Sequence, residues 1–165
     1  MNKKIITGIL FCLSATMAWA EQVVIETKNT TMVLNVDINK QPQYVYYGTK
    51  LSGYDLQHLQ VPRNGRMDAY PAYGMNCPAE AAIAMTHSDG NLSTELYVSG
   101  INKQGDITKI NLKDPQYPVS VALCYKAYFD EDMIETWTEI KNDESKSVTL
   151  TQFASISLPI RRGNV

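Results

Sequence analysis

The sequence predicts an all-β fold, a large antiparallel β-sandwich with at most one short helix. Apolar and polar residues alternate with a period of two along most of the chain, whereas no stretch keeps a helical period over three turns. The alternation is clearest in residues 119–129, 134–140 and 148–158, which follow one another closely. These runs exceed the usual strand length of about 5–6 residues, which favours a large sheet over a small barrel.

Two acidic, turn-like breaks separate these three runs, at Asp130-Glu131-Asp132 and at residues 142–146. We therefore expect the runs to form a three-stranded antiparallel meander. Asp130-Glu131-Asp132 could also be an acid/base pair or a calcium site, but like-charged residues at a hairpin tip are usually solvated turn residues.

The remaining elements follow from the same alternation and from turn signals. Ser88-Asp89-Gly90-Asn91 predicts a tight hairpin turn, because Asp-Gly suits positive φ, and it should join strands 81–86 and 92–100. Residues 52–60 allow one or two helical turns. The other expected strands are 22–27 and 31–38, as an opening hairpin, then 44–51 and 107–112, which brings the total to about nine.

Residues 61–78 differ from the rest of the chain, with three prolines and two glycines. This composition predicts an irregular loop, and irregular loops of such length are often functional. Tyr70 and Tyr73 in this loop are candidates for sugar stacking or for an interface, with ordinary packing as the alternative. Tyr44, Tyr46, Tyr47 and Trp137 are weaker candidates of the same kind.

Residues 1–20 have the pattern of a cleaved secretory signal peptide. Lys3 and Lys4 precede a short apolar stretch at 5–15, and Ala18-Trp19-Ala20 offers small residues for cleavage. We expect an exported protein, periplasmic or extracellular, whose single domain occupies residues 21–165. Two of the 15 basic residues and none of the 17 acidic ones lie in 1–20, so the remainder carries a formal charge of −4. This balance gives no reason to expect nucleic acid or, after cleavage, a membrane as partner.

Residues that could carry chemistry are sparse. Cys77 and Cys124 could form a disulfide after export, or Cys124 could be a buried free thiol. His58 and His87 stand alone, and each is a better packing or surface residue than a general base. We expect no metal site and no cofactor, because two distant cysteines and two isolated histidines do not make a ligand set. On chemistry alone the sequence offers no active site.

Five segments, in order, resemble glycoside hydrolase family 36 α-galactosidases. Each motif is short, but together they span residues 44–158. They are Tyr46-Tyr47-Gly48-Thr49-Lys50-Leu51, Asp68-Ala69-Tyr70-Pro71-Ala72-Tyr73-Gly74, His87-Ser88-Asp89-Gly90, the strand pair within Tyr125–Ile134, and Ile140-Lys141-Asn142 with the strand Val148–Leu158 after it.

The resemblance implies the opening β-sandwich of a retaining enzyme whose two catalytic aspartates lie in a following barrel. Nothing here corresponds to that barrel, so no catalytic residue is assigned, and we expect a truncated, inactive sandwich. Substrates would be α-galactoside oligosaccharides, and the full-length protein would be a homo-oligomer. The resemblance makes Asp68, Tyr70 and Tyr73 the candidates for contacts with substrate or a neighbouring subunit. The sequence departs from the family at residues 75–78 and at Thr136.

A second hypothesis is a stand-alone carbohydrate-binding or surface β-sandwich. If the sandwich is truncated, we expect the isolated chain to be poorly soluble or to self-associate, because an incomplete sandwich exposes strand edges and apolar faces.

Overall fold

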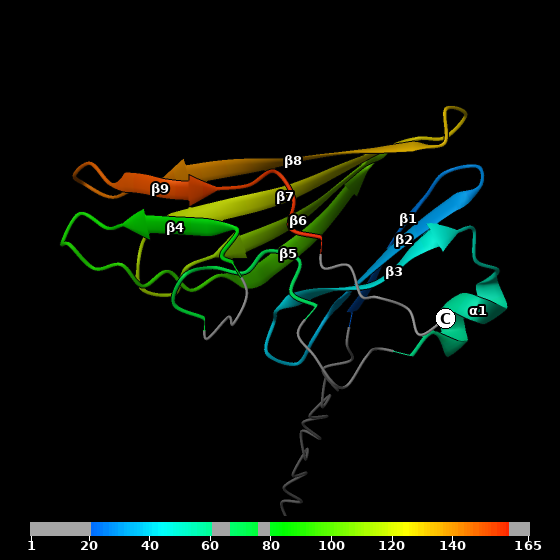
Figure 1. Cartoon of the computed structure of the whole chain (residues 1–165), viewed down its shortest axis with the longest axis horizontal. Coiled ribbons are helices and arrows are strands. Elements are labelled where there is room, and N and C mark those ends of the chain that lie inside the picture. Colours follow the sequence, from blue (N-terminus) through cyan, green and yellow to red (C-terminus); the bar gives the residue numbers. More distant parts are fainter. Residues whose placement is uncertain (1–20, 61–66, 76–79, 159–165) are drawn as a thin grey trace, which may run out of the picture.

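The computed structural model describes residues 21–60, 67–75 and 80–158. Within these ranges nine strands form three antiparallel sheets, and one six-residue helix lies outside them (Figure 1). The prediction of an all-β sandwich with at most one short helix is therefore confirmed. The predicted signal peptide, Cys77 and half of the predicted irregular loop (61–66 and 76–78) lie outside the described residues.

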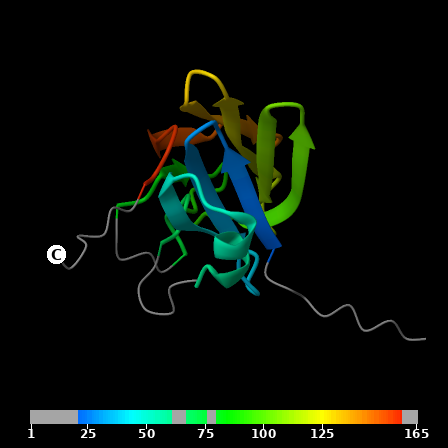
Figure 2. The same ribbon diagram turned by 90° about the vertical axis from the view of Figure 1, so that its right-hand side faces the viewer.

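The first sheet contains β1 (Glu21–Glu26), β2 (Thr30–Val36) and β3 (Pro42–Thr49), in that order. β2 is buried along almost its whole length, and α1 (Gly53–His58) follows β3 in the chain. Gln22 donates from its side-chain amide to the carbonyl of Leu56 (3.4 Å), and Figure 2 shows α1 in front of these strands. Ser52 and Asp55 form a capping box that starts the helix.

The second sheet has the order β5 (Tyr97–Gln104), β6 (Ile107–Lys113), β7 (Val119–Tyr128), β8 (Met133–Asn142). β7 and β8 pair from Val119 opposite Asn142 to Tyr128 opposite Met133. This confirms the hairpin predicted around the acidic turn.

One hydrophobic core joins the inner faces of the sheets. A period of two along each strand supplies its members. Across the middle of the core the hydroxyl groups of Tyr44 and Tyr125 lie 3.2 Å apart. Its members include Ile25, Met32 and Leu34 of the first sheet, Ile83 and Met85 of β4 (Ile83–Thr86), and Ile110, Leu112, Val119, Val121 and Leu123 of the second sheet.

Two predicted strand pairings are wrong. β9 (Thr149–Phe153) pairs with β4 (Ile83–Thr86) in a separate two-stranded sheet, and does not extend the β7–β8 hairpin. The Asp-Gly turn forms, with Gly90 at φ +90°, but β4 does not pair with the segment that follows it. Instead, β5 starts at Tyr97 and pairs with β6. Alternation fixes which face of a strand is buried but not which strand lies beside it.

The acidic turn between β7 and β8 connects two sheets. Asp132 accepts hydrogen bonds from the hydroxyl of Thr27 and from the backbone N–H of Asn29 (3.0 Å). The backbone N–H of Lys28 donates to the carbonyl of Phe129 (3.1 Å). The tips of the β1–β2 and β7–β8 hairpins are thus tied together, so Asp132 has a structural role beyond that of a solvated turn residue.

Candidate functional site

The segment 67–75 carries the three residues singled out from the sequence. It runs between the first sheet and β4, with backbone bridges from Asp68 to Gln43 and from Ala72 to Ile83. Gly74 lies at φ +128°, and a Cβ there would come within 2.9 Å of the Thr94 backbone. The absence of a side chain at Gly74 therefore lets this segment approach residues 93–94 closely.

Asp68, Tyr70 and Tyr73 have different surroundings. Asp68 is half-buried, and Tyr70 is only 4% exposed, with its hydroxyl donating to the carbonyl of Ala154 (3.1 Å). Burial raises the pKa of Tyr70, and hydrogen bonds with Thr138 and Ala154 oppose this effect. Tyr73 is 55% exposed. Of the three, Tyr73 presents most surface to a partner, while Tyr70 fastens the segment to the chain after β9. Their contact with a substrate or a neighbouring subunit stays a prediction.

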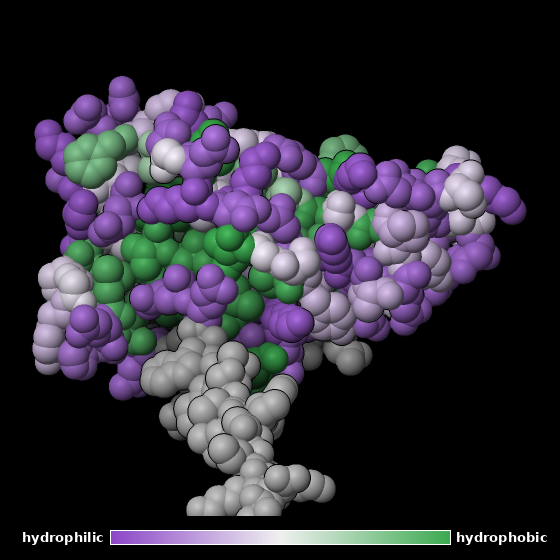
Figure 3. All heavy atoms as spheres, turned by 180° about the vertical axis from the view of Figure 1, so that it is seen from behind, coloured by the Kyte–Doolittle hydropathy of each residue, from purple (hydrophilic) through white to green (hydrophobic). Residues whose placement is uncertain are grey.

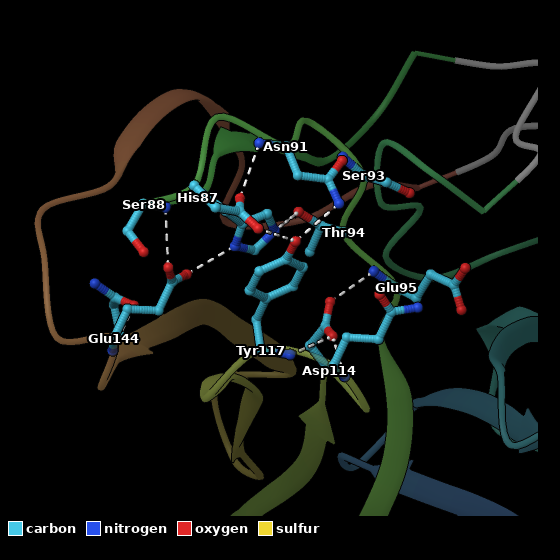
Figure 4. A network of polar contacts seen from close by, with 12 residues as sticks. His87, Ser88, Asn91, Ser93, Thr94, Glu95, Asp114, Tyr117 and Glu144 are labelled. Atoms are coloured by element: carbon cyan, nitrogen blue, oxygen red, sulfur yellow. Dashed lines mark hydrogen bonds and ion pairs between the residues drawn. The ribbon is translucent and has the colours of Figure 1, made fainter.

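A second cluster, which the sequence analysis did not assemble, surrounds His87 (Figure 4). The His87 side chain is fully buried; Nδ1 donates to Glu144 Oε1 (2.7 Å) and Nε2 lies 3.1 Å from the Thr94 hydroxyl. The second carboxylate oxygen of Glu144 accepts from the backbone N–H of Ser88 (3.0 Å). The ring of Tyr117 stacks on the imidazole with centroids 3.6 Å apart. Every polar atom of the imidazole therefore faces a structural partner, which agrees with a packing role.

Tyr117 connects the His87 cluster to the Asp-Gly turn. Its hydroxyl donates to Asp89 (2.9 Å) and accepts from the side chain of Asn91 (2.8 Å). Nearby, Asp114 accepts from the backbone N–H groups of Glu95, residue 116 and Tyr117. No local sequence signal could have revealed this cluster, because its members come from three separate segments, at 87–95, at 114–117 and at Glu144.

A polar groove of about 500 Å³ crosses the outer face of the β5–β8 sheet. Small residues and polar side chains line it, among them Gly100, Asn102, Lys113, Ser120 and Ala122. The described residues contain no cluster of three or more His, Cys, Asp or Glu side chains placed to hold a metal ion.

Cys124 is a buried free thiol whose pKa burial raises to about 11, chiefly because the thiolate would be desolvated. A thiol of this kind is unreactive near neutral pH. Among the described residues no helix is long and apolar enough to cross a membrane.

The fold defines an antiparallel β-sandwich domain. A family model described as the glycosyl hydrolase family 36 N-terminal domain matches residues 40–165, and the chain therefore belongs to that family. No curated protein gave a match.

Solved structures with the same fold are α-galactosidases. The enzyme from Lactobacillus brevis superposes with a TM-score of 0.71 at 16% identity, covering 84% of this chain and 24% of its own. A variant of the family 36 enzyme AgaA from Geobacillus stearothermophilus, in complex with 1-deoxygalactonojirimycin, gives 0.71 at 18% identity with the same coverages. The galactosidase domain of an α-galactosidase–sucrose kinase gives 0.69 at 19% identity, covering 82% of this chain and 24% of its own. The chain thus spans about a quarter of the length of these proteins.

Proposed function

We propose that this chain is the non-catalytic opening sandwich of an exported α-galactosidase, which braces a catalytic barrel and helps to frame a galactoside pocket. The match to the family 36 N-terminal domain over residues 40–165 carries this proposal. The related AgaA variants have been crystallised with raffinose and with stachyose, which makes α-galactoside oligosaccharides the proposed substrates of the whole protein.

The surface of the described residues supports contact with more protein. Figure 3 shows apolar side chains gathered over the middle of one side of the molecule, with hydrophilic ones around them. Large exposed apolar patches are typical of interaction sites. The segment that carries Tyr73 is held in place by bonds to β3 and β4, so an exposed tyrosine there is presented on a rigid support. We propose Asp68, Tyr70 and Tyr73 as the part of this domain nearest to substrate or to a second subunit of a homo-oligomer.

The buried carboxylates support the non-catalytic assignment. Glu144 and Asp114 both accept several hydrogen bonds from the domain itself, which fixes their orientation inside the structure. A retaining glycosidase needs two carboxyl groups about 5–5.5 Å apart and open to the sugar.

Two experiments test the proposal. The purified chain should give no turnover of a chromogenic α-galactoside, and sustained hydrolysis by it would contradict the non-catalytic role. Sequencing the DNA that follows the codon for Val165 should reveal a barrel with paired aspartates, in frame or after a frameshift. An unrelated gene there would favour a stand-alone sandwich.

Export is tested separately. Expression in a bacterial host should yield a periplasmic product that begins at Glu21, detected by intact-mass spectrometry. A cytoplasmic product that keeps residues 1–20 would contradict the signal-peptide assignment.

A further inference from the structure

The groove on the outer face of the β5–β8 sheet is built from two neighbouring rows of side chains. In one row Ser120 of β7 lies between Lys113 of β6 and Lys141 of β8. In the next row Ala122 has the corresponding central place. Both rows point away from the hydrophobic core, because the residues between them on β7, such as Val121, point into it.

The floor of the groove is open because its residues are small. Ser120 and Ala122 occupy the central strand, and Gly100 lies on the β5 side. A Cβ built on Gly100 would meet nothing within 4 Å. Asn111 of β6 lies between Gly100 and Ala122 in this row, and its side-chain amide donates to the carbonyl of Gly100 (3.4 Å), so the open space of the groove lies over Gly100, Ser120 and Ala122.

The polar groups at the edges fall into two kinds. The Nζ of Lys109 donates hydrogen bonds to both carboxylate oxygens of Glu139 (2.7 and 3.0 Å), and the Nζ of Lys141 donates to the carboxylate of Asp143 (2.6 Å). By contrast, within the described residues the side chains of Asn102, Lys113 and Ser120 make no hydrogen bond to protein, and all three line the groove. These groups can bind a ligand without first breaking a protein contact.

The chemistry of the lining favours a neutral, polyhydroxylated ligand. Asn102 and Ser120 can each donate and accept, Lys113 only donates, and the Glu139 carboxylate only accepts. A sugar carries hydroxyl groups that also do both. An anion would meet Glu139 beside the lysines, and an apolar ligand would leave the amide and hydroxyl groups unpaired.

One aromatic residue adjoins the groove. Trp137 lies two residues from Glu139 on the same face of β8, and its indole N–H donates to that carboxylate (3.1 Å). An aromatic ring beside polar groups is suited to a sugar, whose C–H face is apolar and whose edge is polar.

We propose that this groove is a binding site for a neutral oligosaccharide. The inference does not rest on the catalytic role of the whole protein. An isolated chain that binds sugar but has no hydrolytic activity satisfies both proposals.

Stachyose, a neutral tetrasaccharide, is the probe, and the whole chain is titrated with it. Trp19 and Trp137 are the two tryptophans of the sequence, so the difference in emission between the chain and its Trp137→Phe variant isolates the signal at the groove. We expect a saturable change with Kd on the order of 1 mM, and calorimetry gives the same Kd without an optical probe.

Ala122→Gln places an amide on the floor and should weaken binding at least about ten-fold. Thr149→Gln, at an exposed position of β9, is the matched control and should leave Kd unchanged. Asn102→Ala removes one hydrogen-bonding group, with an expected loss of about five-fold. This milder variant tests the site even if Ala122→Gln disturbs the sheet, which far-ultraviolet circular dichroism would reveal.

Three results would overturn the proposed sugar-binding site. A folded chain that shows no saturable signal up to about 100 mM stachyose overturns the site, since affinity there would be negligible. Equal weakening by Ala122→Gln and Thr149→Gln would place binding elsewhere and also overturn it. Loss of binding in about 1 M sodium chloride, where the Debye length is about 3 Å, would show charge-driven binding and exclude the neutral-sugar assignment. Persistence in that salt supports it.

Discussion

Replacing Glu144 with glutamine should destabilise the domain more than any other single-charge change on the β8–β9 connection. The Glu144 side chain is only 4% exposed and accepts bonds from His87 and from the backbone of Ser88. A hydrogen bond to a charged group contributes about 1.5–3 kcal/mol. Glutamine keeps one acceptor oxygen for Ser88 but loses the charge beside His87, so the free energy of unfolding should fall by about 2–3 kcal/mol.

Asp143→Asn is the matched control, one residue earlier. Asp143 pairs with Lys141 at 2.6 Å, but their side chains are 56% and 70% exposed. Exposed pairs contribute about 0–1 kcal/mol, so this variant should unfold almost like the original chain. Urea denaturation followed by far-ultraviolet circular dichroism measures both. Equal losses in the two variants would refute the argument that the buried His87–Glu144 contact holds β4 beside the β8–β9 connection.

The same contact makes a prediction about pH. Burial raises the pKa of Glu144, but hydrogen bonds from His87 and Ser88 lower it by more, so the net pKa lies below its ordinary value. A carboxyl group whose pKa is depressed by folding stabilises the folded state above its unfolded pKa, about 4.3. This contribution is lost as the pH falls through the folded pKa. The difference in stability between the chain and Glu144→Gln should therefore shrink below about pH 4. A difference that stays constant down to pH values near 2 would contradict this assignment.

Three further substitutions test the core and the hairpin tips by urea or thermal unfolding. Leu112→Ala, at a side chain 1% exposed, should cost about 2–5 kcal/mol; a loss below about 1 kcal/mol would show that the core refills the space. Tyr125→Phe should cost about 1–3 kcal/mol because it leaves the buried hydroxyl of Tyr44 without its partner. The double Tyr44→Phe/Tyr125→Phe variant should lose less than the sum of the single losses, and strict additivity would argue against the pair. Asp132→Asn should lower the melting temperature at neutral pH, because bonds from the Thr27 hydroxyl and from a backbone N–H hold the pKa of Asp132 low; an unchanged melting temperature would show that the tips are held by other contacts.

The sequence was sufficient for elements whose partners are adjacent along the chain. The β1–β2 and β7–β8 hairpins, the capped turn at α1 and the buried faces of β7 all follow from alternation and from turn residues. Each depends on interactions over a few residues, which local patterns encode directly.

Pairings and clusters formed over long distances could not be predicted in this way. β9 has the alternation of a third meander strand, yet β4 is its partner. The decisive contact is the bond from His87 to Glu144, which holds the connection before β9 next to the end of β4. The sequence around either residue does not indicate that the two are in contact. Likewise, the groove on the second sheet depends on the register between Lys113, Ser120 and Lys141, which alternation alone leaves open.

The pairing of β4 with β9 also limits when during synthesis the domain can finish folding. Ile83 pairs with Phe153, so the two-stranded sheet cannot form until Phe153 has been synthesised. At a synthesis rate of about 5–20 residues per second, β9 follows β4 by several seconds. During that interval the nascent polypeptide presents an unpaired strand edge, and such edges invite aggregation. We therefore expect chaperones to bind the ribosome-bound nascent chain until β9 has been synthesised.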